Sequence, residues 1–232
     1  MITSTQNKSY KLWQKLKLKK HRDAHGLFLV YGPHLVEKAQ EKEAIVDILT
    51  TRAEIQGTLI SQELMDGLNQ TETGFDVMAV CRKTNPPLTS TRVLMLDDVQ
   101  DPDNVGALVR SAAAFGFRHV IFSLQTADLY NEKVIRASKG AIFDVHVERR
   151  LLDEAIQSFK QQGYAMVCTD TKGQTLTTLE GPLVLVLGNE GHGIQPAIMA
   201  LADHIIHIPV SHVDSLNVAV AGGILMHQWR CV

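Results

Sequence analysis

From residue 92 onward, short apolar runs alternate with segments of helical periodicity, and this alternation constrains the fold more than any other feature. The runs lack polar residues at alternate positions, as is typical of strands buried on both faces of a parallel sheet. They are Val93–Leu96, Val120–Phe122, Ala165–Cys168, Leu183–Leu187 and Ile205–Ile208. The helical segments between them are Asn104–Phe115, Leu151–Gln162, Pro196–Ala202 and Ser215–Trp229. Repeated strand–helix units predict an α/β fold with a parallel sheet over residues 92–232.

A polar, proline-containing stretch separates this region from the first part of the chain. Residues 82–91 (RKTNPPLTST) hold two adjacent prolines and a single apolar side chain, Leu88, which predicts a linker. Residues 1–81 predict a small α/β domain. Its expected strands and helices are Leu27–Tyr31, His34–Glu43, Ala44–Thr50, Ser61–Leu68 and Phe75–Val80. The sequence therefore predicts two domains, 1–81 and 92–232, joined by a linker.

The composition excludes several classes of protein. With 45% hydrophobic residues and a net charge of -2, the chain is not expected to be disordered. Its apolar runs are far shorter than the roughly 18–20 residues of a membrane helix, and no apolar region follows the N-terminus as in a signal peptide. Three cysteines do not make a disulfide framework. We expect a reduced, cytoplasmic protein without a membrane partner.

Seven cations lie within the first 22 residues. They are Lys8, Lys11, Lys15, Lys17, Lys19, Lys20 and Arg22. A polyanion such as RNA would bind such a segment through its phosphates. A solvated helix face gives the same pattern, so composition leaves both interpretations open.

Three polar loops follow strands of the predicted parallel sheet, where ligands bind in folds of this kind. The first, Asp97–Asn104, has four aspartates that suit either a divalent metal or a capped surface loop, with Asp103 or Asn104 as the helix cap. The second, Gly188–Gly193, lacks the spacing of a dinucleotide-binding loop and the lysine of a phosphate-binding loop. Its Glu190 is either catalytic or an acceptor that fixes the backbone. In the third, Pro209–Asn217, Ser215 is the expected helix cap.

A zinc site is the other metal candidate, at Asp203, His204 and His207. His207 falls within an expected strand, which points it away from its neighbours. We therefore expect no metal.

Taken together, the three loops resemble one protein family. The relevant segments are NVGALVRSAAAFGF at 104–117, LVLGNEGHGI at 185–194 and IPV…SLNVAVAGGILM at 208–226, with VIRASKGAIF at 134–143 between them. Their order and placement are similar to those of the SpoU/TrmH family of S-adenosylmethionine-dependent RNA ribose 2'-O-methyltransferases, within the SPOUT superfamily. The N-terminal segment is similar to that family's small ribosomal-protein-like substrate-binding domain.

The resemblance implies a deep trefoil knot in the C-terminal domain and a homodimer with its active site at the subunit interface. It also implies transfer of a methyl group to RNA, with rRNA favoured over tRNA and no metal required. The catalytic and substrate-positioning residues would be Asn104, Arg110, Glu190, Ser215 and Asn217. S-adenosylmethionine would be held around Thr169, Gly188, Ile208 and Leu216, and RNA by Lys15, Lys17, Lys19, Lys20 and Arg22.

Two departures from the family pattern bear on activity. Tyr31 stands where the family usually has Glu, and the third loop has Val210 in place of Met and no glycine at Ser211-His212. That loop looks one residue short. Two other functions therefore stay open: a catalytically impaired RNA-binding protein of the same fold, and a metal-dependent hydrolase that uses the loop Asp and His residues.

Overall fold

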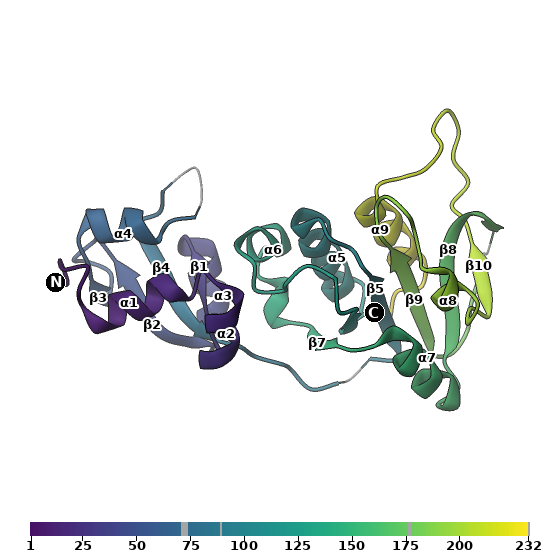
Figure 1. The fold of residues 1–232 in the computed structure, drawn as a ribbon, viewed down its shortest axis with the longest axis horizontal. Coiled ribbons are helices and arrows are strands. Elements are labelled where there is room, and N and C mark those ends of the chain that lie inside the picture. The colour runs from purple at the N-terminus through teal and green to yellow at the C-terminus, as the bar shows by residue number, and fades with distance from the viewer. Residues whose placement is uncertain (71–73, 89, 176–177, 232) are drawn as a thin grey trace. The chain divides into compact units, whose positions relative to one another are not determined.

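The computed structural model describes residues 1–70, 74–88, 90–175 and 178–231, which form two compact units (Figure 1). The N-terminal unit consists of Met1–Thr84 together with Asp128–Phe143. The C-terminal unit consists of Asn85–Ala127 and Asp144–Val232. The sequence did not indicate that residues 128–143 would pack with the N-terminal unit. Thr89, within the predicted linker, lies outside the described residues.

The N-terminal unit is built on a four-stranded sheet in the order β1-β4-β2-β3. Its strands are β1 (Leu27–Tyr31), β2 (Ile45–Thr50), β3 (Thr58–Leu59) and β4 (Val77–Arg82). Strand β4 runs antiparallel to both β1 and β2, while β2 and β3 are parallel. Its helices are α1 (Lys8–Lys15), α2 (Lys19–His25), α3 (Pro33–Glu41), α4 (Gln62–Leu68) and α6 (Glu132–Ser138), followed by a 3-10 turn at Ala141–Phe143.

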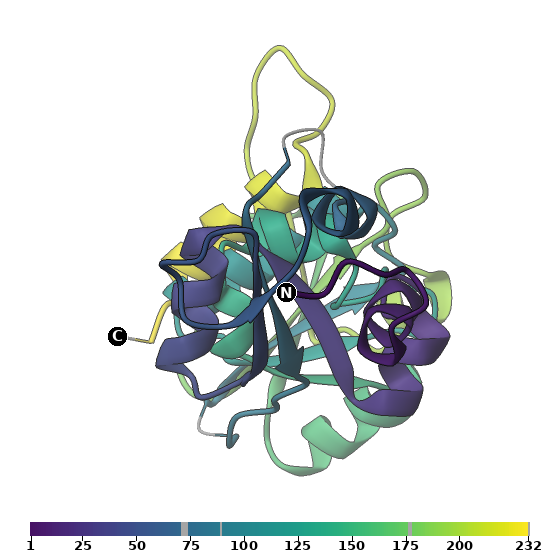
Figure 2. The same ribbon diagram turned by 90° about the vertical axis from the view of Figure 1, so that its left-hand side faces the viewer.

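The lysine-rich N-terminal stretch forms two helices with a turn between them. Asn7 caps α1 by accepting from the backbone of Ser9, and Gly26 ends α2 in a left-handed conformation with φ of 64°. The apolar side of α1 contributes Tyr10 and Trp13 to a core that also includes residues of α4 and of the sheet. The lysines are thereby left mainly on the outer side of both helices. Helix α1 and strand β1, drawn in purple, are turned toward the viewer in Figure 2.

The C-terminal unit is a six-stranded, fully parallel sheet in the order β10-β8-β9-β5-β6-β7, which confirms the predicted parallel α/β fold. Its strands are β5 (Arg92–Asp97), β6 (His119–Phe122), β7 (His146–Arg149), β8 (Ala165–Gln174), β9 (Leu183–Gly188) and β10 (His204–Ile206). Its helices are α5 (Pro102–Ala114), α7 (Leu152–Gln161), α8 (Pro196–Met199) and α9 (Val218–Gln228). Strand β7 was not predicted, because this edge strand has only a half-buried sequence, HVER.

Helix α9 packs closely on its own chain through a glycine. A Cβ atom on Gly222 would lie 2.4 Å from the side chain of Leu108 in α5 and 2.6 Å from that of Leu187 in β9. Small residues in α9 therefore serve packing within the unit.

No helix among the described residues is long and apolar enough to cross a membrane.

Candidate active site

The first two loops begin side by side at the carboxyl edge of the parallel sheet. Asp97, the last residue of β5, is paired in register with Gly188, the last residue of β9. The third loop follows β10 and leads into α9, and residues Pro209–Ser215 of this loop are all exposed. It extends away from the sheet in both views (Figures 1 and 2).

A chain of hydrogen bonds joins one residue from each of the three loops. Asn217 accepts from the backbone N–H groups of Ala219 and Val220 at 2.8 and 3.3 Å, and so caps α9. Its Nδ2 donates to Oδ1 of Asn104 at 2.9 Å. Nδ2 of Asn104 in turn donates to Oε1 of Glu190 at 2.9 Å. Because α9 offers only N–H donors at this end, the cap fixes the orientation of Asn217 and, through it, that of Asn104.

Glu190 lies at the end of this chain and is surrounded by donors. Besides Asn104, the backbone N–H groups of Gln100 and Asp101 approach its two carboxylate oxygens at 3.4 Å each. Three donors thus converge on one carboxylate, whose oxygens act as hydrogen-bond acceptors. Of the two roles considered for Glu190, this geometry favours the acceptor that fixes the backbone.

A second set of contacts, which the sequence did not reveal, clamps the loop after β9. Asp97 is fully buried, and its two carboxylate oxygens accept from the backbone N–H and the side-chain amide of Gln195 at 2.7 and 2.8 Å. Asn189 donates to the carbonyl of Asp98 at 2.7 Å. Burial raises the pKa of the Asp97 carboxyl, and the bonds from Gln195 oppose that shift.

Helix α5 begins earlier than predicted. Its cap is Asp101, which accepts from the backbone of Asp103 at 2.8 Å, so the expected cap at Asp103 or Asn104 was wrong. The physical reason is Pro102, which suits the first helical position and leaves the residue before it as the cap. The earlier start leaves the buried side chain of Asn104 free to point toward Glu190 rather than to cap the helix.

Arg110 lies on the exposed side of α5. A surface arginine at this position could instead pair with one of the aspartates of the first loop. Among the residues that the structure describes, the side chain of Arg110 forms no ion pair or hydrogen bond. Its guanidinium is thus available for an external anion.

The expected helix cap at Ser215 was wrong. Ser215 is exposed in the third loop and does not cap α9. The helix begins three residues later, at Val218, with Asn217 as its cap. The structure therefore brings Asn104, Glu190 and Asn217 into contact, while Arg110 and Ser215 have no direct bond to these three.

Three of the residues expected around the methyl donor lie in or just after neighbouring strands of the sheet. Thr169 lies in β8, Gly188 ends β9 and Ile208 comes two residues after β10. A Cβ atom on Gly188 would lie 2.3 Å from both the carbonyl carbon of Gly193 and the nitrogen of Ile194, so only glycine fits there. Neither Ile208 nor Leu216 donates a backbone hydrogen bond to another described residue. These free N–H groups suit a ligand that is read mainly by backbone contacts.

Asp203, which we considered above as a zinc ligand, is engaged in other contacts. It accepts from the backbone of Met166 and pairs with Lys160, both at 2.8 Å. Strand β10 ends at Ile206, so His207 follows the strand rather than lying within it. In the described part of the chain, no three His, Cys, Asp or Glu side chains are grouped as ligands for a metal ion.

The five expected RNA contacts differ in exposure. Lys15, Lys19 and Lys20 are exposed, although Lys19 pairs with Asp23. Lys17 is half-buried and donates to the carbonyl of Gly67, and burial lowers the pKa of its ammonium group. Arg22 is only 6% exposed, and its guanidinium is bonded within the chain. It is therefore not available as a surface contact, since its cationic group is held away from solvent.

Comparisons with known proteins agree with this geometry. Residues 91–227 match the SpoU rRNA Methylase family, and residues 7–89 match the MRM3-like substrate binding domain. The chain is 34% identical to the 23S rRNA (guanosine(2553)-2'-O)-methyltransferase RlmP of Bacillus subtilis, over 99% of this chain and 98% of that protein. It is also similar to two solved structures. One is an AdoMet-bound rRNA methyltransferase from Sinorhizobium meliloti, with 26% identity, a TM-score of 0.85 and coverage of 98% and 95% of the two chains.

The other is an RNA 2'-O ribose methyltransferase, with 27% identity, a TM-score of 0.81 and coverage of 98% and 96%. The family match extends over more than half of the chain and includes all three loops that the hydrogen bonds join. On this sequence match and this fold, the chain belongs to the SpoU rRNA Methylase family.

Proposed function

We propose that this enzyme transfers a methyl group from S-adenosylmethionine to a ribose 2'-hydroxyl in structured RNA, with rRNA rather than tRNA as the substrate. The observation that carries the proposal is the hydrogen-bonded chain from Asn217 through Asn104 to Glu190, which ties the family's three loops together at one edge of the sheet. The rRNA specificity named for the B. subtilis relative supports the choice of substrate.

The proposed mechanism assigns binding and alignment to this chain's own residues. When bound, S-adenosylmethionine supplies an already activated methyl group, so the protein's task is to align the hydroxyl and help remove its proton. Gly188, Ile208, Leu216 and Thr169 hold the donor. Arg110 grips an RNA phosphate and stabilises negative charge that develops on the ribose oxygen. Ser215 and Asn217 position the reacting groups, and no metal is needed.

The proposal includes a homodimer and a trefoil knot in the C-terminal unit. The outer side of α9 supports the dimer, since Val220 and Ile224 are 51% and 43% exposed and Val213 in the preceding loop is 56% exposed. A two-fold arrangement that covers such a surface is the commonest oligomer. Sedimentation at micromolar concentration is expected to give twice the chain mass of 25.7 kDa. An active monomer would contradict a shared site.

The cytoplasm, where the RNA substrate resides, is the proposed location.

Transfer of labelled methyl groups tests the function directly. Tritium from S-adenosylmethionine is expected to appear in rRNA and not in tRNA, and mapping of the product should place it on a ribose 2'-oxygen. Label in tRNA alone would overturn the substrate class. If the protein binds RNA and donor but transfers no methyl group, the alternative function is favoured: a catalytically impaired RNA-binding protein of the same fold.

Donor binding is expected to need no added metal. S-adenosylmethionine or its demethylated product should raise the melting temperature by the ordinary effect of a ligand on the native state. Calorimetry in the presence of a chelator provides the measurement. Loss of binding in the chelator, restored by zinc, would favour the metal-dependent alternative.

The exposed lysines near the turn between α1 and α2 are expected to supply RNA affinity. Replacing Lys15, Lys19 and Lys20 with Gln should make the dependence of log Kobs on log salt shallower by about 0.7–0.9 for each phosphate that is no longer neutralised. Because all three side chains are exposed, the melting temperature should change little. An unchanged salt slope in filter-binding assays would show that this surface does not touch the RNA.

A further inference from the structure

The segment 128–143 is part of the N-terminal unit although it lies between two strands of the methyltransferase sheet. Its aromatic residues pack around Phe28 of β1, which is fully buried. The ring centroid of Phe28 lies 4.5 Å from that of Tyr130 and 5.9 Å from that of Phe143. The segment thus shares the core of the unit that carries the N-terminal lysines.

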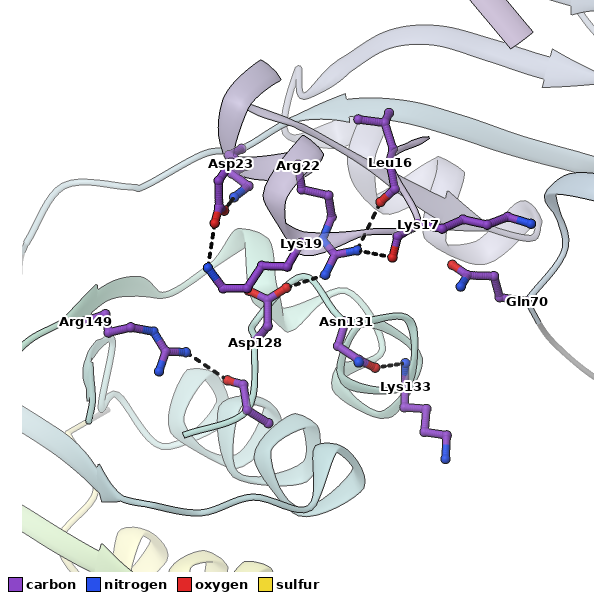
Figure 3. Close-up of polar contacts among 12 residues, drawn as sticks. Leu16, Lys17, Lys19, Arg22, Asp23, Gln70, Asp128, Asn131, Lys133 and Arg149 are labelled. Atoms are coloured by element: carbon purple, nitrogen blue, oxygen red, sulfur yellow. Dashed lines mark hydrogen bonds and ion pairs between the residues drawn. The ribbon is translucent and has the colours of Figure 1, made fainter. Parts of the chain in front are cut away.

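A largely buried ion pair attaches this segment to the turn between α1 and α2 (Figure 3). Arg22 donates from Nη1 to the carbonyls of Leu16 and Lys17 at 3.0 and 2.7 Å, and from Nη2 to Asp128 at 2.6 Å. The side chains of Arg22 and Asp128 are 7% and 18% exposed. Leu16 and Lys17 form the turn itself, so one guanidinium holds both the lysine-bearing turn and the start of the segment.

Three exposed cations follow one another at intervals of three residues: Lys133 and Arg136 in α6, and Lys139 at its C-cap. The buried residues of α6 are Val134, Ile135 and Ser138. Arg136 pairs with Glu132 at 3.3 Å. The ammonium groups of Lys133 and Lys139 have no partner among the described residues, and the side chain of Lys133 extends freely from α6 in Figure 3.

We propose that residues 128–143 form a second part of the RNA-binding surface, in which Lys133 and Lys139 contact the phosphate backbone of the substrate RNA. Arg22 and Asp128 act as positioning residues that hold α6 in place beside the lysine-bearing turn. This inference rests on the proposed function, because RNA is the polyanion that the N-terminal unit is proposed to bind. The match of residues 7–89 to a substrate-binding domain favours RNA over an acidic protein as the occupant.

The inference is tested by single charge reversals in the full-length protein. Lys133→Glu and Lys139→Glu are each expected to lower affinity for rRNA at least about 3-fold at low salt and to make the salt slope shallower by about 0.7–0.9. Arg118→Glu is the matched control, since Arg118 is exposed in the C-terminal unit just before β6, at the opposite end of the strand from the loops. The control should leave RNA affinity and its salt dependence near wild type.

If Lys133→Glu and Lys139→Glu have the same RNA affinity and salt slope as the Arg118→Glu control, the inference is overturned. If the variant with Lys15, Lys19 and Lys20 replaced by Gln still shows a shallower salt slope in that case, the proposed RNA role of the N-terminal unit survives. If that variant also binds normally, the proposed role of the whole unit fails. The two failures are therefore distinguishable.

A double-mutant cycle tests the positioning role of Asp128. Asp128→Asn keeps the shape of the side chain and removes its charge. If Asp128 positions α6, the loss of affinity caused by Lys133→Glu should shrink in the Asp128→Asn background. Additive losses at a temperature well below melting would show that Asp128 has only a general structural role, and would refute the positioning step.

Discussion

Arg110→Ala is expected to slow single-turnover methylation of RNA by about 100-fold, comparable to the removal of one preorganised hydrogen-bond donor from a transition state. Arg110 lies on α5, six residues after Asn104, and is therefore carried by the helix whose first turn is fixed to Glu190. The residue is exposed and forms no ion pair with other described residues. A substitution at such a position breaks no hydrogen bond or ion pair of the side chain within the described part of the chain, so a large kinetic effect has to come from the bound substrate.

Two further measurements separate this role from a general effect on the protein. Arg110→Lys should rescue poorly, because an ammonium group cannot form the two parallel bonds that a guanidinium gives to phosphate. Donor affinity and melting temperature should stay near wild type in both variants. Near-normal methylation by Arg110→Ala at saturating RNA would refute the assigned role and the alignment of the first loop.

The parallel sheet could be predicted from the sequence because its central strands are buried on both faces and leave an uninterrupted apolar signature. Strands β5 and β9 are such runs, and the predicted ends of both lie within one residue of their ends in the structure. Strand β7 and helix α6 escaped prediction for the opposite reason. Strand β7 lies at the edge of the sheet with a mixed sequence, and α6 has only seven residues.

The side-chain contacts of the site could not be predicted, since each joins residues that are far apart in sequence. Asn217 and Asn104 are separated by 113 residues, and Asp97 and Gln195 by 98. The three loops were visible in the sequence, but their contacts depend on the tertiary fold. The register of β5 against β9 brings the Asp97 and Gln195 loops together, and the packing of α9 on α5 brings Asn217 to Asn104.

Arg22 illustrates the same limit in the N-terminal unit. In sequence it is one more cation after a run of lysines, but its partner Asp128 lies 106 residues away. No local pattern distinguishes a buried, paired arginine from its exposed neighbours.

Asn217→Asp is expected to reduce methylation by about 10- to 100-fold while leaving the protein folded. An aspartate caps a helix about as well as asparagine, and its charge at the N-terminus of α9 is favourable by about 0.3–1 kcal/mol. It has, however, no N–H to donate to Asn104. The Asn104 amide then turns its Nδ2 toward the new carboxylate and its carbonyl oxygen toward Glu190, where two acceptors repel each other. Loss of one hydrogen bond to a charged group costs about 1.5–3 kcal/mol, which corresponds to the expected fall in rate.

The comparison among substitutions at residue 217 distinguishes the hydrogen-bonded chain from the helix cap. Asn217→Ser keeps a capping oxygen but loses the bond to Asn104, so it should be as slow as Asn217→Asp with a near-normal melting temperature. Asn217→Ala loses both functions and should also be less stable by about 1 kcal/mol. Single-turnover rates and thermal unfolding measured on the same preparations give both quantities. Wild-type rates in the Asp and Ser variants, with a defect only in Ala, would mean that Asn217 serves the helix alone. In that case the orientation of Asn104 toward Glu190 would not be required for methyl transfer.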